Sequence, residues 1–187
     1  MARLPALDPA RLTGAQKALY DKIARGPRGR VAGPLEAMVR CPVVGDPLQE
    51  LGGRLRFAGV LPGKLRELAI LVAARFWTAQ LEWHAHARIA REEGLDDAVI
   101  AALAAGAHPE LASPEESAVY AFCSELHETR TVGDDTYAQA VEALGQEAVI
   151  ELTVLSGYYT TVSMILNAFR VPVPEGDAPP LRPLSEA

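Results

Sequence analysis

Two side chains that can exchange protons, Glu82 and His86, lie four residues apart in the sequence. In a helix this spacing places both on one face, about one turn apart. An imidazole donates or accepts protons near neutral pH, and a neighbouring carboxylate orients and charges it. The remaining positions of that face are small or apolar: Ala79, Ala85, Ile89 and Ala90. The pattern predicts a buried, coupled Glu82–His86 pair, with His84 on the solvated side.

A second carboxylate, Glu67, lies on an apolar face of the preceding predicted helix. The core-facing stripe of that helix follows the helical period: Leu65, Leu68, Ala69, Val72 and Phe76. Glu67 lies on the other side, which Leu71 and Ala74 make apolar as well. A carboxylate in such surroundings is paired, protonated or functional. The alternative is a place in the first helical turn, where the helix dipole favours a negative charge.

Other reactive arrangements are weaker. A Glu-x-x-x-His pair can bind a metal ion, but no further ligand shares the face of Glu82 and His86, so no metal is expected. Cys41 and Cys123 are 82 positions apart and form no Cys-x-x-Cys motif, which is typical of unpaired thiols in a reducing compartment. Cys123 and His127 share a helical face, where we expect a packed thiol beside a surface imidazole.

Helix signals dominate the chain, and strand signals are nearly absent. A Thr-x-x-Gln capping box at Thr13 begins the first predicted helix, and a Ser-Pro-Glu-Glu box at residues 113–116 begins a later one. The predicted helices cover residues 13–25, 34–40, 46–58, 64–77, 79–93, 96–106, 114–130, 134–145 and 146–169. The predicted class is all-α, as a single domain in three parts. These are an N-terminal helical extension (1–45), a helical domain (46–170) and a Pro-rich tail (171–187).

Composition limits the function. The chain has 187 residues, 49% of them hydrophobic, which excludes a disordered protein. Its net charge of −6 argues against nucleic acids and anionic membranes as partners. No uninterrupted apolar run reaches the roughly 18 residues that span a bilayer, and the N-terminus lacks a signal-peptide pattern. We therefore expect a soluble, cytoplasmic protein.

Residues 61–103 resemble the carboxymuconolactone decarboxylase family within the AhpD-like (alkyl hydroperoxidase D-like) superfamily. The resemblance rests on Arg-Glu-Leu at 66–68, Glu-Trp-x-x-His at 82–86 and Ala-x-Glu-x-Gly-Leu-x-Asp at 90–97. The hydroperoxidase branch carries a Cys-x-x-Cys motif before the histidine. Here Ala79 and Glu82 occupy the two cysteine positions, so peroxidase activity by the family mechanism should be absent.

The resemblance implies an AhpD-like helical fold, chemistry without a cofactor, and a homo-oligomer (dimer, trimer or hexamer). It also implies a lyase-type reaction on a small anionic substrate, such as a carboxylated unsaturated lactone or keto acid of aromatic catabolism. In that reaction His86 would donate or shuttle the proton. Glu82 would orient the His86 imidazole, and Glu67 would be a second acid or base.

Substrate contacts are expected from two further groups. Trp83 and Tyr158 are predicted to line the pocket, with core packing as the alternative for both. The substrate carboxylate needs a cation, and Arg66 and Arg75 are both available for it. Two alternatives to the lyase stay open. One is a redox protein that uses other thiols, and the other is a non-catalytic, ligand-binding member of the family.

Overall fold

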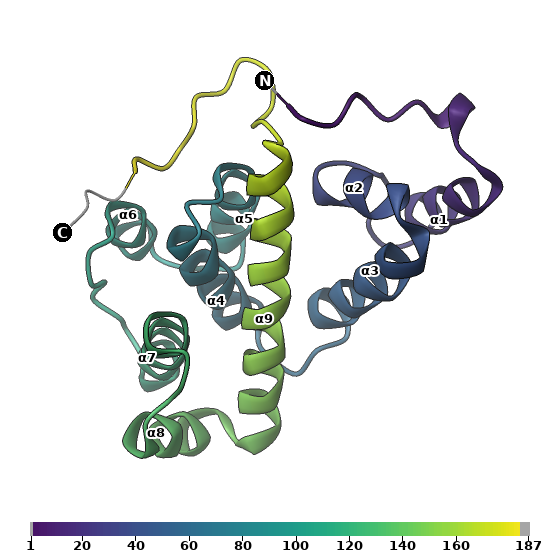
Figure 1. Ribbon diagram of the computed structural model, residues 1–187. Coiled ribbons are helices and arrows are strands. Elements are labelled where there is room, and N and C mark those ends of the chain that lie inside the picture. Colours follow the sequence, from purple (N-terminus) through teal and green to yellow (C-terminus); the bar gives the residue numbers. More distant parts are fainter. Residues whose placement is uncertain (1, 184–187) are drawn as a thin grey trace. The chain divides into compact units, whose positions relative to one another are not determined.

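The computed structural model describes residues 2–183, and within them it is entirely helical (Figure 1). A short 3-10 helix, Pro9–Arg11, precedes nine α-helices. The α-helices are α1 (Gly14–Arg25), α2 (Pro34–Arg40), α3 (Pro42–Phe57), α4 (Gly63–Phe76), α5 (Gln80–Glu92), α6 (Asp97–Ala105), α7 (Pro114–Thr129), α8 (Asp134–Leu144) and α9 (Gln146–Phe169). The all-α class predicted from the sequence is confirmed.

Contacts between Cα atoms divide the chain into two compact units. The first comprises residues 2–59 together with Ile165–Pro172, and the second comprises Val60–Met164 together with residues 173–183. The division at residues 45 and 170 expected from the sequence stays a prediction.

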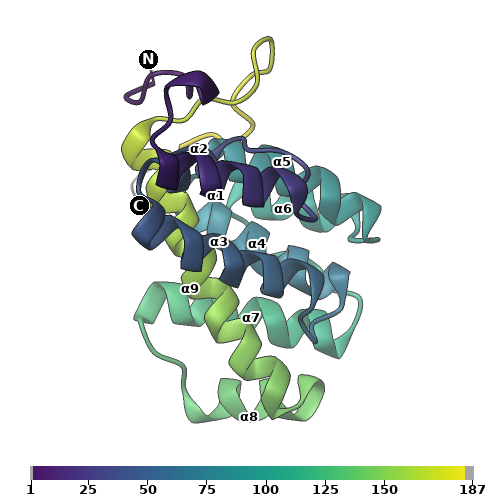
Figure 2. The ribbon, with the colours of Figure 1, turned by 90° about the vertical axis from the view of Figure 1, so that its right-hand side faces the viewer.

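In the first unit, α1, α2 and α3 pack against one another (Figure 2). The predicted capping box is present, because Thr13 Oγ1 accepts from the Gln16 amide and Gln16 Oε1 accepts from the Thr13 amide. The third helix begins at Pro42, earlier than predicted, because proline fits the first turn of a helix. Gly45 lets α3 approach α2, since a Cβ there would lie 2.0 Å from the Met38 carbonyl oxygen.

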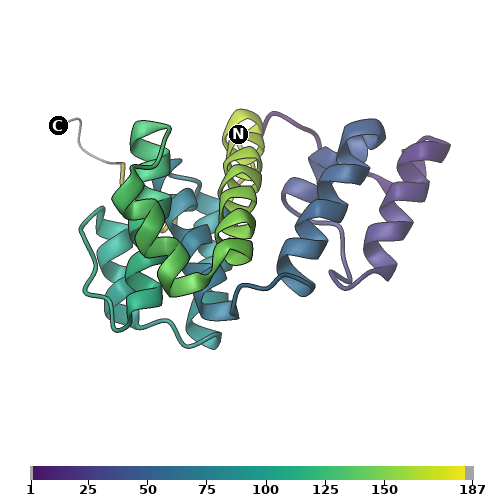
Figure 3. The same cartoon turned by 90° about the horizontal axis from the view of Figure 1, so that it is seen from below.

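The centre of the second unit is α4, which is buried at almost every position from Leu65 to Arg75. It packs against α5, α6 and α7, and α7 in turn packs against α8 (Figure 3). Phe76, expected in the core stripe, is instead 44% exposed, because α4 ends there and the chain turns away. A three-residue connection follows, in which Thr78 takes a left-handed conformation (φ 47°) and the Ala79 amide donates to the Ala74 carbonyl.

The long helix α9 contributes its first part to the second unit. The Glu151 carboxylate accepts from the backbone amides of Val60 (2.7 Å) and Leu61 (3.1 Å) and so fixes the chain just before α4. In the described part of the chain, α9 alone is long and apolar enough to cross a membrane by length and composition. Half of its most apolar 18-residue stretch is nevertheless buried inside the protein. Such burial is typical of the core helix of a soluble protein.

The C-terminal segment is extended and bound to the second unit. We call residues 177–182 the strap. The Gln80 amide group forms two hydrogen bonds with the Leu181 backbone, at 2.8 and 2.9 Å, and Leu181 is only 3% exposed. Arg75 Nη1 donates to the Arg182 carbonyl at 3.0 Å, and His84 pairs with Asp177 at 2.8 Å. The Pro-rich tail, predicted as extended, therefore has defined anchors on α4 and α5.

Candidate functional site

The structure brings Glu67, Glu82 and His86 together as one hydrogen-bonded row. His86 Nδ1 lies 2.6 Å from Glu67 Oε2, and His86 Nε2 lies 3.0 Å from Glu82 Oε1. All three are buried, with 0%, 5% and 5% of Glu67, Glu82 and His86 exposed. Each nitrogen of the imidazole therefore faces a different carboxylate. We call these three residues the relay.

Local sequence and a tight turn together build the relay. Glu82 and His86 are one turn apart on α5, as their spacing predicts. The short connection at Thr78 turns the chain back so that α5 packs along α4, and this brings Glu67 to the other side of the imidazole. Glu67 lies in the second turn of α4, because that helix begins at Gly63. Glu67 therefore does not lie in the first turn, where the helix dipole would stabilise its negative charge.

Electrostatics favour the charged form of His86. Burial by itself lowers the pKa of the imidazole, because a charged group loses its hydration. The charge of Glu82 and the hydrogen bonds with Glu67 and Glu82 outweigh burial and raise the pKa of His86 to about 9. The imidazolium, with both N–H groups donating, is therefore the form at neutral pH. The site is ready to give a proton rather than to take one.

The two candidate cations for a substrate carboxylate have different environments. Arg66 is already neutralised, since its Nε lies 3.5 Å from Glu67 Oε1 and its Nη2 lies 3.8 Å from Glu93 Oε1. Glu67 Oε1 is itself buried without a hydrogen-bond partner among the described residues, so the Arg66 charge is its main compensation. Arg75 forms no ion pair within residues 2–183.

The aromatic residues expected near the relay are buried beside it. Trp83 is 4% exposed and Tyr158 is 6% exposed. It is Tyr159, however, that contacts the His86 ring, edge to face with centroids 5.2 Å apart, while Tyr158 packs against Tyr159 in the same manner. The sequence analysis named Tyr158 and not Tyr159, because the rotation of α9 about its axis does not follow from the sequence alone. The substrate-contact roles of Trp83 and Tyr158 stay predictions.

Neither thiol is part of the hydrogen-bonded relay. Ala79, at the position of the first family cysteine, is fully buried. Cys123 is buried, its thiol lies 3.4 Å from Ser156 Oγ, and burial raises its pKa to about 12. Cys41 is exposed, and both cysteines are free. His127, expected on the surface, instead stacks on Phe76, and burial lowers its pKa.

A metal ion has no evident set of ligands at the relay. The two nitrogens of His86 point to carboxylates on opposite sides of the ring, so the three side chains do not face a common point. Across residues 2–183, no group of three His, Cys, Asp or Glu side chains is arranged to hold a metal.

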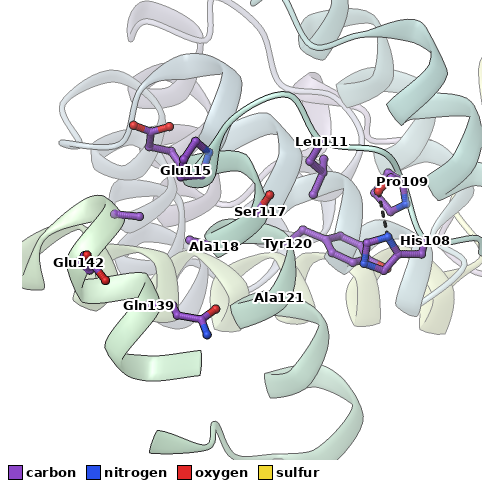
Figure 4. Close-up of a pocket in the computed structure, with 12 residues that line it drawn as sticks. His108, Pro109, Leu111, Glu115, Ser117, Ala118, Tyr120, Ala121, Gln139 and Glu142 are labelled. Carbon is purple, nitrogen blue, oxygen red and sulfur yellow. Dashed lines mark hydrogen bonds between the residues drawn. The ribbon is translucent and has the colours of Figure 1, made fainter. Parts of the chain in front are cut away.

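A cavity of about 690 Å³ opens elsewhere in the second unit, between the α6–α7 connection, α7 and α8. Glu115 and Glu142 lie toward one side of it, and His108 and Tyr120 toward the other (Figure 4). No relay residue lines this cavity. The sequence held no signal for it, because its wall combines a loop with two helices whose packing is not local.

Comparisons with known proteins agree with this fold. The model of the Carboxymuconolactone decarboxylase family matches residues 42–125. No curated protein matches the sequence. An uncharacterized peroxidase-related protein from Ralstonia eutropha JMP134, with the alkylhydroperoxidase AhpD core, has a TM-score of 0.76 at 14% identity, over 93% of this chain and 93% of that chain.

A second solved structure is a protein of unknown function from Agrobacterium tumefaciens, described as an AhpD candidate in antioxidant defence. It has a TM-score of 0.65 at 18% identity and covers 72% of this chain and 93% of that chain. Both structures define the fold as AhpD-like. The chain carries a carboxymuconolactone decarboxylase family region within that fold, which confirms the resemblance predicted from its motifs.

Proposed function

We propose that this protein is an acid–base enzyme that needs no cofactor and releases CO2 from a small carboxylated unsaturated lactone or keto acid. The observation that carries the proposal is His86, held as a buried imidazolium between Glu67 and Glu82. A charged imidazole in a buried site is a general acid, and its two carboxylates supply routes for reprotonation.

The reaction needs such an acid. When the bond between a carbon and its carboxylate breaks, the electron pair stays on that carbon, in conjugation with a neighbouring carbonyl. His86 would transfer its proton to this carbon, which balances the loss of CO2. A proton from solvent would then restore the imidazolium. In this scheme Glu82 and Glu67 orient the imidazole and keep it charged between turnovers.

The redox alternative has little physical support. A thiol peroxidase needs a thiolate, and burial keeps the Cys123 thiol protonated. Cys41 is exposed, but it lies in the first unit, outside the residues that form the relay. We expect no consumption of hydroperoxide above the buffer rate with a dithiol reductant.

The test is an assay of carboxylated lactones and keto acids in D2O. The expected result is CO2 release with deuterium at the carbon that lost it, and at least a 100-fold loss of rate in His86→Gln, consistent with the usual contribution of a general acid. His108→Gln, at an exposed histidine outside the relay, is the matched control. Equal rates in both variants would reject His86 as the acid. Saturable binding of these acids without turnover would make the protein a ligand-binding member of the family.

We propose further that the protein is cytoplasmic and acts as a homo-oligomer. Three large apolar side chains on α9 support the second point, since Ile150, Val154 and Met164 are 60%, 41% and 47% exposed. Light scattering on a size-exclusion column should give a mass above 20.0 kDa, and a clean monomer would contradict it.

A further inference from the structure

Arg75, in the last turn of α4, is a buried cation that forms no ion pair with an acidic side chain among residues 2–183. The residue is only 6% exposed, and its buried Nε has no hydrogen-bond partner among the described residues. Its one hydrogen bond to the strap goes to a neutral group, the Arg182 carbonyl. Burial lowers the pKa of the guanidinium, which records the cost of removing this charge from water.

Other cations of the same unit that approach buried surfaces have anions. Lys64 pairs with the buried Glu116, and Arg66 lies between Glu67 and Glu93. Removing a charge from water costs several kcal/mol unless an opposite charge compensates it. A guanidinium with a free buried N–H is also the group that binds a planar oxyanion with two parallel hydrogen bonds. The exception at Arg75 therefore points to a missing anion.

The strap covers this guanidinium and can be displaced without unfolding a helix. Its anchors near Arg75 are hydrogen bonds between side chains and the backbone: Gln80 and Arg75 donate to the Leu181 and Arg182 carbonyls, and the Leu181 amide donates to Gln80 Oε1. Because the strap is extended, moving Arg182 breaks no helical hydrogen bond. A carboxylate in this position would replace the neutral Arg182 carbonyl with a full negative charge.

We propose that Arg75 binds the carboxylate of a small organic acid and that the strap opens at Arg182 to admit it and closes over it. The inference rests on the proposed function for the substrate class, and it selects Arg75 over Arg66 as the cation for the substrate. Arg75 lies eight residues after Glu67 on α4, about 12 Å along the helix axis. Glu82 lies two residues after Gln80 in the first turn of α5, and Gln80 is the residue that anchors the strap.

The test is an NMR titration of the full-length, 15N-labelled protein with succinate, at ionic strength held constant with NaCl. The expected result is a saturable shift of the Arg75 Nε–H signal together with the Leu181 and Arg182 amides. Arg75→Gln should weaken binding by about 10- to 100-fold, the usual effect of losing a charge-assisted hydrogen bond. Arg88→Gln, at an exposed arginine on α5, should leave it unchanged.

Further arms keep the outcome clear. Gln80→Ala loosens the strap and should strengthen binding of succinate. Inorganic phosphate is titrated in parallel, and saturation by phosphate alone would overturn the assignment to an organic acid. Equal affinity in wild type and Arg75→Gln would overturn the site. If Arg75→Gln does not fold, an unmoved Nε–H signal in the wild type overturns it instead.

These measurements are independent of turnover. Succinate binding at Arg75 without CO2 release from any acid would reject the proposed reaction and keep the anion site. Turnover with an Arg75 signal that does not respond would reject the site and keep the reaction.

Discussion

The stability of the protein should fall as pH rises through the range in which His86 loses its proton. The pKa of His86 is about 9 in the folded protein, above the ordinary value of 6.5 that applies to the unfolded chain. The folded state therefore holds this proton more tightly than the unfolded state does. The resulting stabilisation is complete below pH 6.5 and is lost as pH rises through 9.

The size of the effect follows from the same two values. One pKa unit corresponds to about 1.4 kcal/mol, so the rise from 6.5 to about 9 contributes about 3 kcal/mol to the free energy of unfolding. This is a large share of the roughly 5–15 kcal/mol that stabilises an ordinary domain. Screening by solvent does not reduce it much, because His86 and both carboxylates are buried.

Urea unfolding of wild type and His86→Gln between pH 6 and 10 measures this contribution. Other groups also titrate in this range, but they cancel in the difference between the two proteins. Wild type should lose about 3 kcal/mol more than His86→Gln across the range. The matched control, His108→Gln, should follow the wild-type curve.

A direct titration provides the second arm. The imidazole signals of His86 should titrate well above 6.5 in wild type, and at lower pH in Glu82→Gln, because that variant removes the leading favourable charge. Parallel unfolding curves for wild type and His86→Gln, or a His86 pKa at or below 6.5, would refute the description of the relay as a charged row.

Two further predictions concern packing and thiol chemistry. Gly45→Ala should destabilise the protein by about 1–3 kcal/mol, because the new Cβ would meet a backbone carbonyl of α2. Gly53→Ala is the control, because a Cβ there meets open space and should not destabilise the protein. Equal urea midpoints for the two variants would contradict this prediction. A thiol reagent should label Cys41 in the native protein and Cys123 only after unfolding, since Cys123 is buried with a raised pKa; rapid native labelling of both would contradict it.

Much of the fold was predictable because its signals are local. The bounds of α2 and α9 match those expected from the sequence, and the capping box at Thr13 is formed. Errors arose where a local rule had an exception. The start of α3 was missed because the preceding helix was expected to end before Pro42 and the next to begin at residue 46, although proline is compatible with the first turn of a helix.

The candidate site divides in the same way. The shared face of Glu82 and His86, their burial, and the apolar surroundings of Glu67 all follow from helical spacing. The pairing of Arg66, the contact of Tyr159 with His86 and the anchors of the strap carried no local signal. Each depends on how one helix is rotated against another or on where the tail crosses α4 and α5.

The sequence by itself indicated the helices, the resemblance to a family and the three candidate residues for proton exchange, because periodicity, caps and motifs act over a few neighbouring positions. Only the tertiary structure decided that Glu67 meets His86, since this contact depends on the turn at Thr78. It also decided the direction of the His86 pKa shift and the lack of an anion at Arg75 among the described residues. Both reflect the balance between lost hydration and partners that folding brings from distant parts of the chain.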